Sequence, residues 1–361
     1  MNNFIIKTEA TDNKARVNQV SINNKNFTTP TFMPVATRGA LRSLPFKYLE
    51  NTDIVLGNTY HLYLRPGLDV IKKFNGIHNF IGWDKLVLTD SGGFQGWSIP
   101  SKFKDNGIEF KNIYDGSKFL MTPELSMDIQ QTINSDIAMI LDNLIDIDRE
   151  YSHQKYAIEV TTKWAQKAYD YHQNDNQSLF GIIQGGIHKD LRTKSLKDML
   201  NIGFDGYAIG GLAIGESIEQ RKQIVDFTVQ QLPPEKLRYV MGLGDINGML
   251  EMIELGVDMF DCVWPARLAR HGKIINKGQF FNLKNNKYKL DTEPLVIGCN
   301  CFTCKNYSKA YLRHLLLNES TSSWFYLTLH NFVQTENILN EVRESILNSE
   351  FDKYKESIIN G

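Results

Sequence analysis

Short apolar runs alternate with segments of helical spacing along most of the chain. Runs rich in β-branched and aromatic residues bounded by turn residues are typical of buried strands, whereas apolar positions three to four residues apart are typical of helices. We expect strands at 31–36, 53–60, 86–90, 137–142, 179–184, 206–212, 237–243 and 257–263. This alternation predicts an α/β fold, a (β/α)8 TIM barrel, with a doubly wound open sheet as the alternative.

Helix signals lie between these runs. Thr122 followed by Pro123 predicts an N-cap with proline at the first helical position. Ser217 and Gln220 have the spacing of a capping box. One apolar stripe is expected on a helix that carries Ala157, Val160, Trp164, Ala168 and Tyr171.

The length of 361 residues fits one barrel with a smaller appended unit. We therefore expect a single barrel domain over residues 1–361. The N-terminal segment Met1 to Phe4 shows no basic-then-apolar leader, and no apolar run approaches the length of a membrane span. We expect a soluble, cytoplasmic protein with no membrane partner.

Two acids, Asp90 and Asp261, lie at or near the ends of predicted strands. Asp90 closes the apolar run that begins at Leu86, and Asp261 lies near the end of the run that begins at Val257. An ionised carboxylate is costly to remove from water, so a buried strand that ends in an acid is a poor structural choice. Because the active site of a barrel lies at the carboxyl ends of its strands, these acids predict a catalytic rim.

Other strand ends carry polar or glycine-rich groups. Asp142 and Gln184 each close an apolar run, and glycine pairs follow several runs. A carboxylate and a primary amide can together read the donor and acceptor edge of a planar heterocycle. Phe94 and Met241 are candidates to sandwich such a ring.

Three of the four cysteines, Cys299, Cys301 and Cys304, lie within six residues. In a cytoplasmic chain such a cluster indicates metal binding rather than disulfides, and a closed structural zinc site needs a fourth ligand. His314 and His330 are the candidates, and spacing alone does not choose between them. Cys262 is interpreted as a small apolar residue beside Asp261.

The net charge of −1 conceals an uneven distribution. The segment from Arg267 to Arg313 contains ten Lys or Arg residues and only two acids, Asp291 and Glu293. This excess predicts a polyanionic partner on one side of the molecule, because phosphate contacts dominate nucleic-acid affinity. A solvated basic face is the alternative.

The motifs together identify a family. The chain resembles the tRNA-guanine transglycosylases of the bacterial type, which exchange the wobble guanine of certain tRNAs for a 7-deazaguanine base. The resemblance spans about residues 30 to 331 and rests on the stretches 57–62, 89–95, 181–185, 207–212, 257–262 and 299–304. In the family the zinc histidine follows the last cysteine by 26 residues, which favours His330.

The resemblance implies a role for each candidate residue. Asp261 matches the nucleophile that attacks the ribose, and Asp90 matches the general acid/base. The base-binding positions match Asp142, Gln184, Gly211, Leu212, Phe94 and Met241. Arg267 and Arg270 match basic positions near the anticodon.

Further expectations follow from the same resemblance. They are a structural Zn²⁺ held by Cys299, Cys301, Cys304 and His330, a zinc-binding subdomain at 280–335 packed on the barrel, and a homodimer. No nucleotide cofactor is expected, because the glycosidic bonds broken and formed have similar energy.

The sequence departs from the family pattern at several positions. Leu144 replaces a usual cysteine, as in relatives that insert complete queuine, whereas Ile214 keeps a bulky side chain where those relatives have glycine. Ala266 and Trp264 replace a usual threonine and leucine. A non-catalytic tRNA-binding subunit and a metal-dependent barrel hydrolase are the competing functions. The first should lack the aspartates, and the second needs an open metal position.

Overall fold

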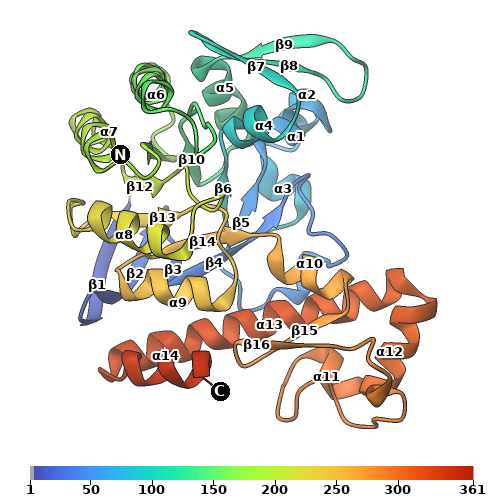
Figure 1. Ribbon diagram of the computed structural model, residues 1–361. Coiled ribbons are helices and arrows are strands. Elements are labelled where there is room, and N and C mark those ends of the chain that lie inside the picture. Colours follow the sequence, from blue (N-terminus) through green and yellow to red (C-terminus); the bar gives the residue numbers. More distant parts are fainter. Residues whose placement is uncertain (1–3, 361) are drawn as a thin grey trace.

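A computed structural model describes residues 4–360, so Met1 to Asn3 and Gly361 lie outside the described part of the chain. Eight parallel strands form a closed barrel (Figure 1). They are β4 (Thr31–Ala36), β5 (Ile54–Gly57), β6 (Leu86–Thr89), β10 (Ile137–Met139), β11 (Ser178–Ile183), β12 (Gly206–Ile209), β13 (Leu237–Val240) and β14 (Met259–Cys262). The predicted (β/α)8 barrel is confirmed, and the open doubly wound sheet is wrong because β14 pairs with β4.

Helices connect most neighbouring strands of the barrel (Figure 1). They are α1 (Thr59–Leu64), α2 (Leu68–Lys73), α3 (Ile77–Ile81), α4 (Gly93–Ser98), α5 (Pro123–Ile133), α6 (Tyr151–Tyr171), α7 (Lys189–Ile202), α8 (Ile218–Val229) and α9 (Ile246–Glu254). The 3-10 turn η1 (Phe46–Tyr48) lies between β4 and β5. A small antiparallel sheet follows α4 and consists of β7 (Ser101–Lys104), β8 (Gly107–Lys111) and β9 (Lys118–Met121).

The predicted helix caps are confirmed. The hydroxyl of Thr122 accepts a hydrogen bond of 3.1 Å from the backbone N–H of Leu125, at the start of α5. Ser217 and Gln220 form both bonds of a capping box at the start of α8. These side chains satisfy backbone donors that have no partner within the helix.

The predicted apolar stripe on α6 is confirmed at Ala157, Val160, Trp164 and Ala168, which are buried. It is wrong at Tyr171, which is 40% exposed. The hydroxyl of Tyr171 donates a hydrogen bond of 2.9 Å to Asp128 on α5. A tyrosine combines an apolar ring with a polar tip, so it suits the edge of a helix interface as well as its centre.

A second antiparallel sheet packs at the amino-terminal end of the barrel. It contains β1 (Ile5–Asp12), β2 (Ala15–Ile22) and β3 (Lys25–Thr29). Arg16 on β2 donates two hydrogen bonds, of 2.8 and 2.6 Å, to the fully buried carboxylate of Asp258, which directly precedes β14. Asn18 and the backbone N–H of Arg238 donate to the same carboxylate. These bonds attach the sheet to the end of the barrel opposite the predicted catalytic rim.

The chain continues beyond β14 into a unit that lies along one side of the barrel (Figure 1). Its elements are α10 (Trp264–Arg270), β15 (Lys273–Asn276), β16 (Gln279–Asn282), η2 (Asn286–Tyr288), α11 (Phe302–Asn306), α12 (Lys309–Asn318), α13 (Ser320–Leu347) and α14 (Phe351–Asn360). The long helix α13 contacts α10, β15 and the barrel strand β4, and so joins this unit to the barrel. Within residues 4–360, no helix combines the length and apolar character needed to traverse a bilayer.

Asp258→Asn is expected to lower the free energy of unfolding by about 3–5 kcal/mol, because it leaves the buried guanidinium of Arg16 without a counter-charge. Urea denaturation followed by circular dichroism measures the change. Glu350→Gln is the control, since the Glu350–Lys353 pair is exposed and contributes at most about 1 kcal/mol. Equal effects of the two substitutions would contradict this account of Asp258.

Candidate active site and metal centre

A cavity of about 320 Å³ lies at the carboxyl ends of the barrel strands. Asp90 follows β6, Asp142 follows β10, and Asp261 belongs to β14. All three carboxylates line the cavity, and no Lys or Arg of the described chain forms an ion pair with any of them. The acids predicted at separate strand ends therefore share one enclosed space.

Two donors orient Asp261. The hydroxyl of Tyr239 donates to its Oδ1 at 2.5 Å, and the backbone N–H of Gly242 donates to the same oxygen at 2.8 Å. Burial raises the pKa of Asp261, and these two hydrogen bonds oppose the rise. An ion pair between Asp261 and Arg267 does not form among the described residues, so the alternative role as a structural ion-pair partner is wrong.

Asp90 is held by the segment that follows β5. The side-chain amide of Asn58 donates to its Oδ2 at 2.5 Å, and the backbone N–H of Thr59 donates to its Oδ1 at 2.9 Å. Asp90 does not cap the helix that follows it, since the N-cap of α4 is Gly92. Burial raises the pKa of Asp90 to about 7, and the charges of Asp261 and Asp142 contribute to the rise. Such a carboxyl can both release and accept a proton near neutral pH.

Asp142 and Gln184 form one side of the cavity. The side-chain amide of Gln184 donates to Oδ2 of Asp142 at 2.5 Å, so Gln184 binds a side chain rather than a backbone group of the barrel. Burial raises the pKa of Asp142 to about 6. Gly211, which has φ +67°, lies so close that a Cβ atom there would be 2.5 Å from Oε1 of Gln184. A side chain at position 211 would have to displace this amide, and the positive φ also favours glycine there.

Several apolar residues complete the lining. Phe94 is 49% exposed, and Phe94, Leu212 and Met241 all line the cavity. Leu144 and Ile214, two of the positions that depart from the family pattern, also line it. Cys262 lines it too, and burial beside Asp261 raises the pKa of its thiol to about 12, which agrees with its interpretation as an apolar residue.

The two predicted RNA-contacting arginines lie outside the cavity lining. Arg267 is exposed and Arg270 partly buried on α10, directly after the strand that carries Asp261. Burial lowers the pKa of Arg270, and the charges of Arg42 and Arg267 lower it further. The charges of Arg42 and Arg267 therefore act on the guanidinium of Arg270.

Sequence reasoning missed Tyr239, Asn58 and Arg42. Tyr239 lies within an apolar strand, where an aromatic residue is expected to pack rather than to orient an acid. Asn58 directly follows the run of β5, so the rule that selected Asp142 and Gln184 would also have selected it. Arg42 lies in an irregular segment, and no local pattern connects it with α10.

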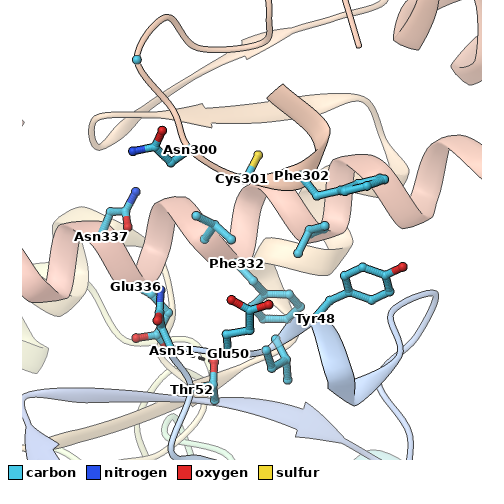
Figure 2. Close-up of a pocket in the computed structure, with 14 residues that line it drawn as sticks. Tyr48, Glu50, Asn51, Thr52, Asn300, Cys301, Phe302, Phe332, Glu336 and Asn337 are labelled. Carbon is cyan, nitrogen blue, oxygen red and sulfur yellow. Dashed lines mark hydrogen bonds between the residues drawn. The ribbon is translucent and has the colours of Figure 1, made fainter. Parts of the chain in front are cut away.

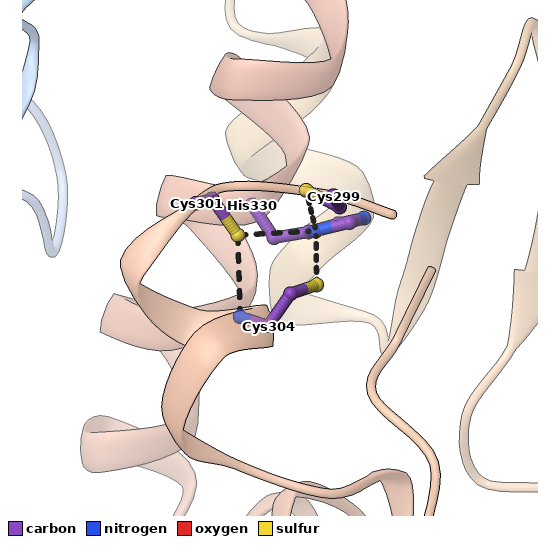
Figure 3. Close-up of side chains that lie close together, drawn as sticks. All are labelled: Cys299, Cys301, Cys304 and His330. Carbon is purple, nitrogen blue, oxygen red and sulfur yellow. Dashed lines mark hydrogen bonds between the residues drawn. The ribbon is translucent and has the colours of Figure 1, made fainter. Parts of the chain in front are cut away.

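The four predicted metal ligands lie together (Figure 3). Their ligand atoms, three sulfurs and one nitrogen, are all within 4.8 Å of one another. The distances from Nδ1 of His330 to the sulfurs of Cys299, Cys301 and Cys304 are 3.8, 3.6 and 3.3 Å. A tetrahedral zinc ion would place these atoms about 3.6 Å apart. His314 is exposed on α12 and lies outside the group.

The surroundings of this cluster also fit a metal. Nε2 of His330 lies 3.0 Å from the carbonyl oxygen of Ile275, which holds the N–H on Nε2 and leaves Nδ1 free to bind. The side-chain amide of Gln334 donates to the sulfur of Cys299 at 3.3 Å. The residues present can therefore hold a four-coordinate ion with no open position.

A second cavity, of about 240 Å³, lies between residues 48–52, the loop around Cys301 and helix α13 (Figure 2). Thr52 donates a hydrogen bond of 3.2 Å to Glu336, and burial raises the pKa of Glu336 to about 7. This cavity contains no residue from a carboxyl end of a barrel strand. The first cavity, which gathers the predicted strand-end groups, is therefore the candidate active site.

Comparison with known proteins agrees with this geometry. The family model described as queuine tRNA-ribosyltransferase matches residues 11–361. The chain belongs to the queuine tRNA-ribosyltransferase family.

Bacterial members of this family are similar to the chain over nearly its whole length. Proteins named queuine tRNA-ribosyltransferase from Dictyoglomus turgidum and Francisella tularensis subsp. novicida are each 41% identical to it. The alignments cover 96% of this chain and 91% of the first relative, and 98% of this chain and 97% of the second. The relative from Fusobacterium nucleatum is 42% identical over 98% of this chain and 96% of its own length. The family predicted from the motifs is therefore confirmed.

Asp261→Asn is expected to lower the pKa of Asp90 below about 7, because it removes a like charge that disfavours ionisation of Asp90. Carbon NMR of aspartate carboxyl groups measures the titration. Asp226→Asn, at an aspartate with a salt bridge to Lys14 at the surface, should leave the pKa of Asp90 unchanged. A rise or no change in the Asp261 variant would show that the two carboxylates do not interact.

Proposed function

We propose that the protein is a tRNA-guanine transglycosylase of queuosine modification. It exchanges the wobble guanine of tRNAs with a GUN anticodon for a 7-deazaguanine base, through a covalent ribosyl-aspartate. The observation that carries this proposal is the pair of partly buried carboxylates, Asp261 and Asp90, on one cavity at the carboxyl ends of the strands. Family membership supports it.

The first half of the reaction uses Asp261 as nucleophile. Both of its recorded hydrogen bonds go to Oδ1, which leaves Oδ2 free to attack the anomeric carbon of the ribose. The bond from that carbon to guanine breaks, and its electron pair leaves with the base. Asp90, with a pKa of about 7, donates a proton to the departing guanine. The ester-like bond between Asp261 and the sugar then holds the tRNA on the enzyme.

The second half reverses these events with a different base. The incoming 7-deazaguanine transfers a proton to Asp90, and its ring nitrogen attacks the anomeric carbon while the bond to Asp261 breaks. Two inversions at one carbon retain its configuration, as in retaining glycosidases. Asp90 returns to its protonated form, so no proton is gained or lost over the cycle.

Base recognition is assigned to the side of the cavity that Asp142 and Gln184 form. Asp142, Gln184 and the backbone of Gly211 present acceptors and donors to the edge of the base, and Leu212 meets its substituent. Phe94 and Met241 contact its faces. Arg267 and Arg270 are assigned to phosphates of the anticodon loop, because guanidinium groups form strong bonds with phosphate oxygens.

The metal centre is assigned a structural zinc ion. Three thiolates and one imidazole are the ligands that zinc prefers in closed sites, and zinc bound there would hold the segment 280–335 as a subdomain on the barrel. A homodimer formed through this segment is part of the proposal. Phe302 and Tyr311 support it, because both are large aromatic residues that are exposed in the single chain.

A non-catalytic tRNA-binding subunit is the competing function within the family. It would have no use for an oriented nucleophile, whereas Tyr239 and Gly242 fix one oxygen of Asp261 and leave the other free. A metal-dependent hydrolase is disfavoured because all four donors of the metal cluster converge on one point away from the cavity.

Asp261→Asn is expected to reduce exchange of radiolabelled guanine into tRNA by at least about 10⁴-fold, because an amide cannot form the ribosyl ester. The variant should also fail to give a covalent tRNA adduct on a denaturing gel. Asp226→Asn serves as the control for general effects of losing a carboxylate, and should behave as wild type. Normal exchange by Asp261→Asn would remove Asp261 from its role.

Cys301→Ala is expected to reduce bound zinc from one ion per chain to a small fraction and to lower the Tm, because structural zinc contributes directly to folding. Atomic absorption and differential scanning calorimetry measure the two effects. Cys262→Ala removes the one cysteine outside the cluster and should keep the zinc. Equal metal content in both variants would contradict the ligand assignment.

A further inference from the structure

Arg192 on α7 is fully buried behind the base-recognition wall. One of its terminal nitrogens donates to the carbonyl oxygens of Ile183 and Gly210, both at 2.8 Å. Its Nε donates to the carbonyl oxygen of Gly186 at 2.9 Å. A single guanidinium therefore ties the carboxyl end of β11 to that of β12.

The three carbonyls flank the residues assigned to the base. Ile183 and Gly186 lie on either side of Gln184 along the chain, and the backbone N–H of Gln184 donates to the hydroxyl of Ser195, also on α7. The carbonyl of Gly210 belongs to the same peptide group as the N–H of Gly211. No acceptor for that N–H is recorded within residues 4–360, and Gly211 lines the cavity.

When the carbonyl oxygen of a peptide group accepts a hydrogen bond, the N–H of the same peptide group becomes a stronger hydrogen-bond donor. A charged donor on the Gly210 oxygen withdraws electron density from the peptide, so the Gly211 N–H becomes a stronger donor. Burial lowers the pKa of Arg192 to about 9, so its guanidinium still carries a full charge at neutral pH. The low polarity around a buried charge makes this polarisation stronger than it would be in water.

A packing role alone does not account for this side chain. Its second terminal nitrogen has no hydrogen-bond partner within the described chain, which is a cost that an apolar side chain would avoid. Arg192 makes no ion pair among the described residues, although the charge of Glu216 stabilises it at longer range. The charge is therefore retained at a cost, next to the peptide groups that face the base.

We propose that Arg192 is a positioning and specificity residue, which polarises the Gly210–Gly211 peptide so that the Gly211 N–H binds the exocyclic carbonyl oxygen of the base. It also holds Gln184 in register with Gly211. This inference rests on the proposed function for its biological meaning. The polarisation itself is a property of the free protein, so it can be tested without any assay of base exchange.

Glycine labelled with ¹³C at the carbonyl and ¹⁵N at the amide isolates the relevant peptide. Directly bonded ¹³C–¹⁵N pairs arise only at Gly92-Gly93, Gly185-Gly186 and Gly210-Gly211. The Gly211 signal is assigned by its loss in Gly211→Ala. In Arg192→Met its amide proton should move upfield and the Gly210 carbonyl carbon with it, while the Gly93 signal stays in place.

Arg192→Lys retains a charge but reaches fewer carbonyls, so it should give a smaller shift in the same direction. If Arg192→Met does not fold, Arg192→Lys and the wild-type spectrum still test whether Arg192 polarises the Gly210–Gly211 peptide. In the wild type, the Gly210 carbonyl should be the most downfield of the three, because it alone accepts a bond from a cation. An unshifted Gly211 signal in a folded variant would overturn the inference.

Exchange assays test the consequence for base recognition. Sulfur is a weak hydrogen-bond acceptor, so the wild type should prefer guanine over 6-thioguanine in kcat/KM. In Arg192→Met and Arg192→Lys this preference should fall by about fivefold or more, mainly through KM for guanine. Leu196→Ala, a buried truncation on the same helix, should leave the preference unchanged even where it lowers stability.

The NMR and exchange measurements together distinguish the role of Arg192 from the proposed function. A shifted Gly211 signal together with no exchange activity in the wild type would reject the proposed function but keep the polarised peptide. Exchange in the wild type with an unchanged base preference in the Arg192 variants would keep the function and reject the role of Arg192.

Discussion

The placement of three carboxylates around one cavity, without a paired cation among the described residues, is the constraint on which the site depends. The closed barrel places Asp90, Asp142 and Asp261 at the carboxyl ends of β6, β10 and β14, and no cation of the described chain pairs with them. Each is stabilised instead by neutral donors: Asn58 and Thr59, Gln184, and Tyr239 with Gly242. Burial raises the pKa of Asp90 to about 7, and its neutral donors orient the carboxyl without lowering the pKa as far as a paired cation would.

At the opposite end of the barrel, a buried acid is paired with a cation. Asp258 directly precedes β14 and is fully buried, and it receives two bonds from the side chain of Arg16 and further bonds from Asn18 and the backbone N–H of Arg238. Its charge is compensated, and it serves to join the β1–β3 sheet to the barrel. Two acids only three residues apart, Asp258 and Asp261, therefore serve stability and the candidate chemistry respectively.

The barrel and most strand-end groups could be predicted from the sequence, because each strand appears as a short apolar run and each group lies at the end of such a run. Eight apolar runs became eight barrel strands, and the acids that end them meet because parallel strands present their carboxyl ends on one side. Local sequence patterns do not predict contacts between segments that are distant along the chain. Tyr239 lies among apolar strand residues, and only the closure of the barrel brings its hydroxyl to Asp261. The choice of His330 over His314 from residues alone was equally open, since the path of α13 decides it.

Helix α13 connects the metal centre with the backbone that follows Asp261. His330 faces the cysteine cluster, and its neighbour Asn331 donates to the carbonyl oxygens of Pro265 and Lys273 and accepts from the N–H of Ile275. Pro265 lies four residues after Asp261, in the first turn of the helix that carries Arg267 and Arg270. An ion held by this cluster would therefore help to fix the backbone around the start of α10, the helix that the proposed function assigns to RNA contacts. Under the proposed function, loss of the metal would weaken base exchange although no residue of the active-site cavity is a metal ligand.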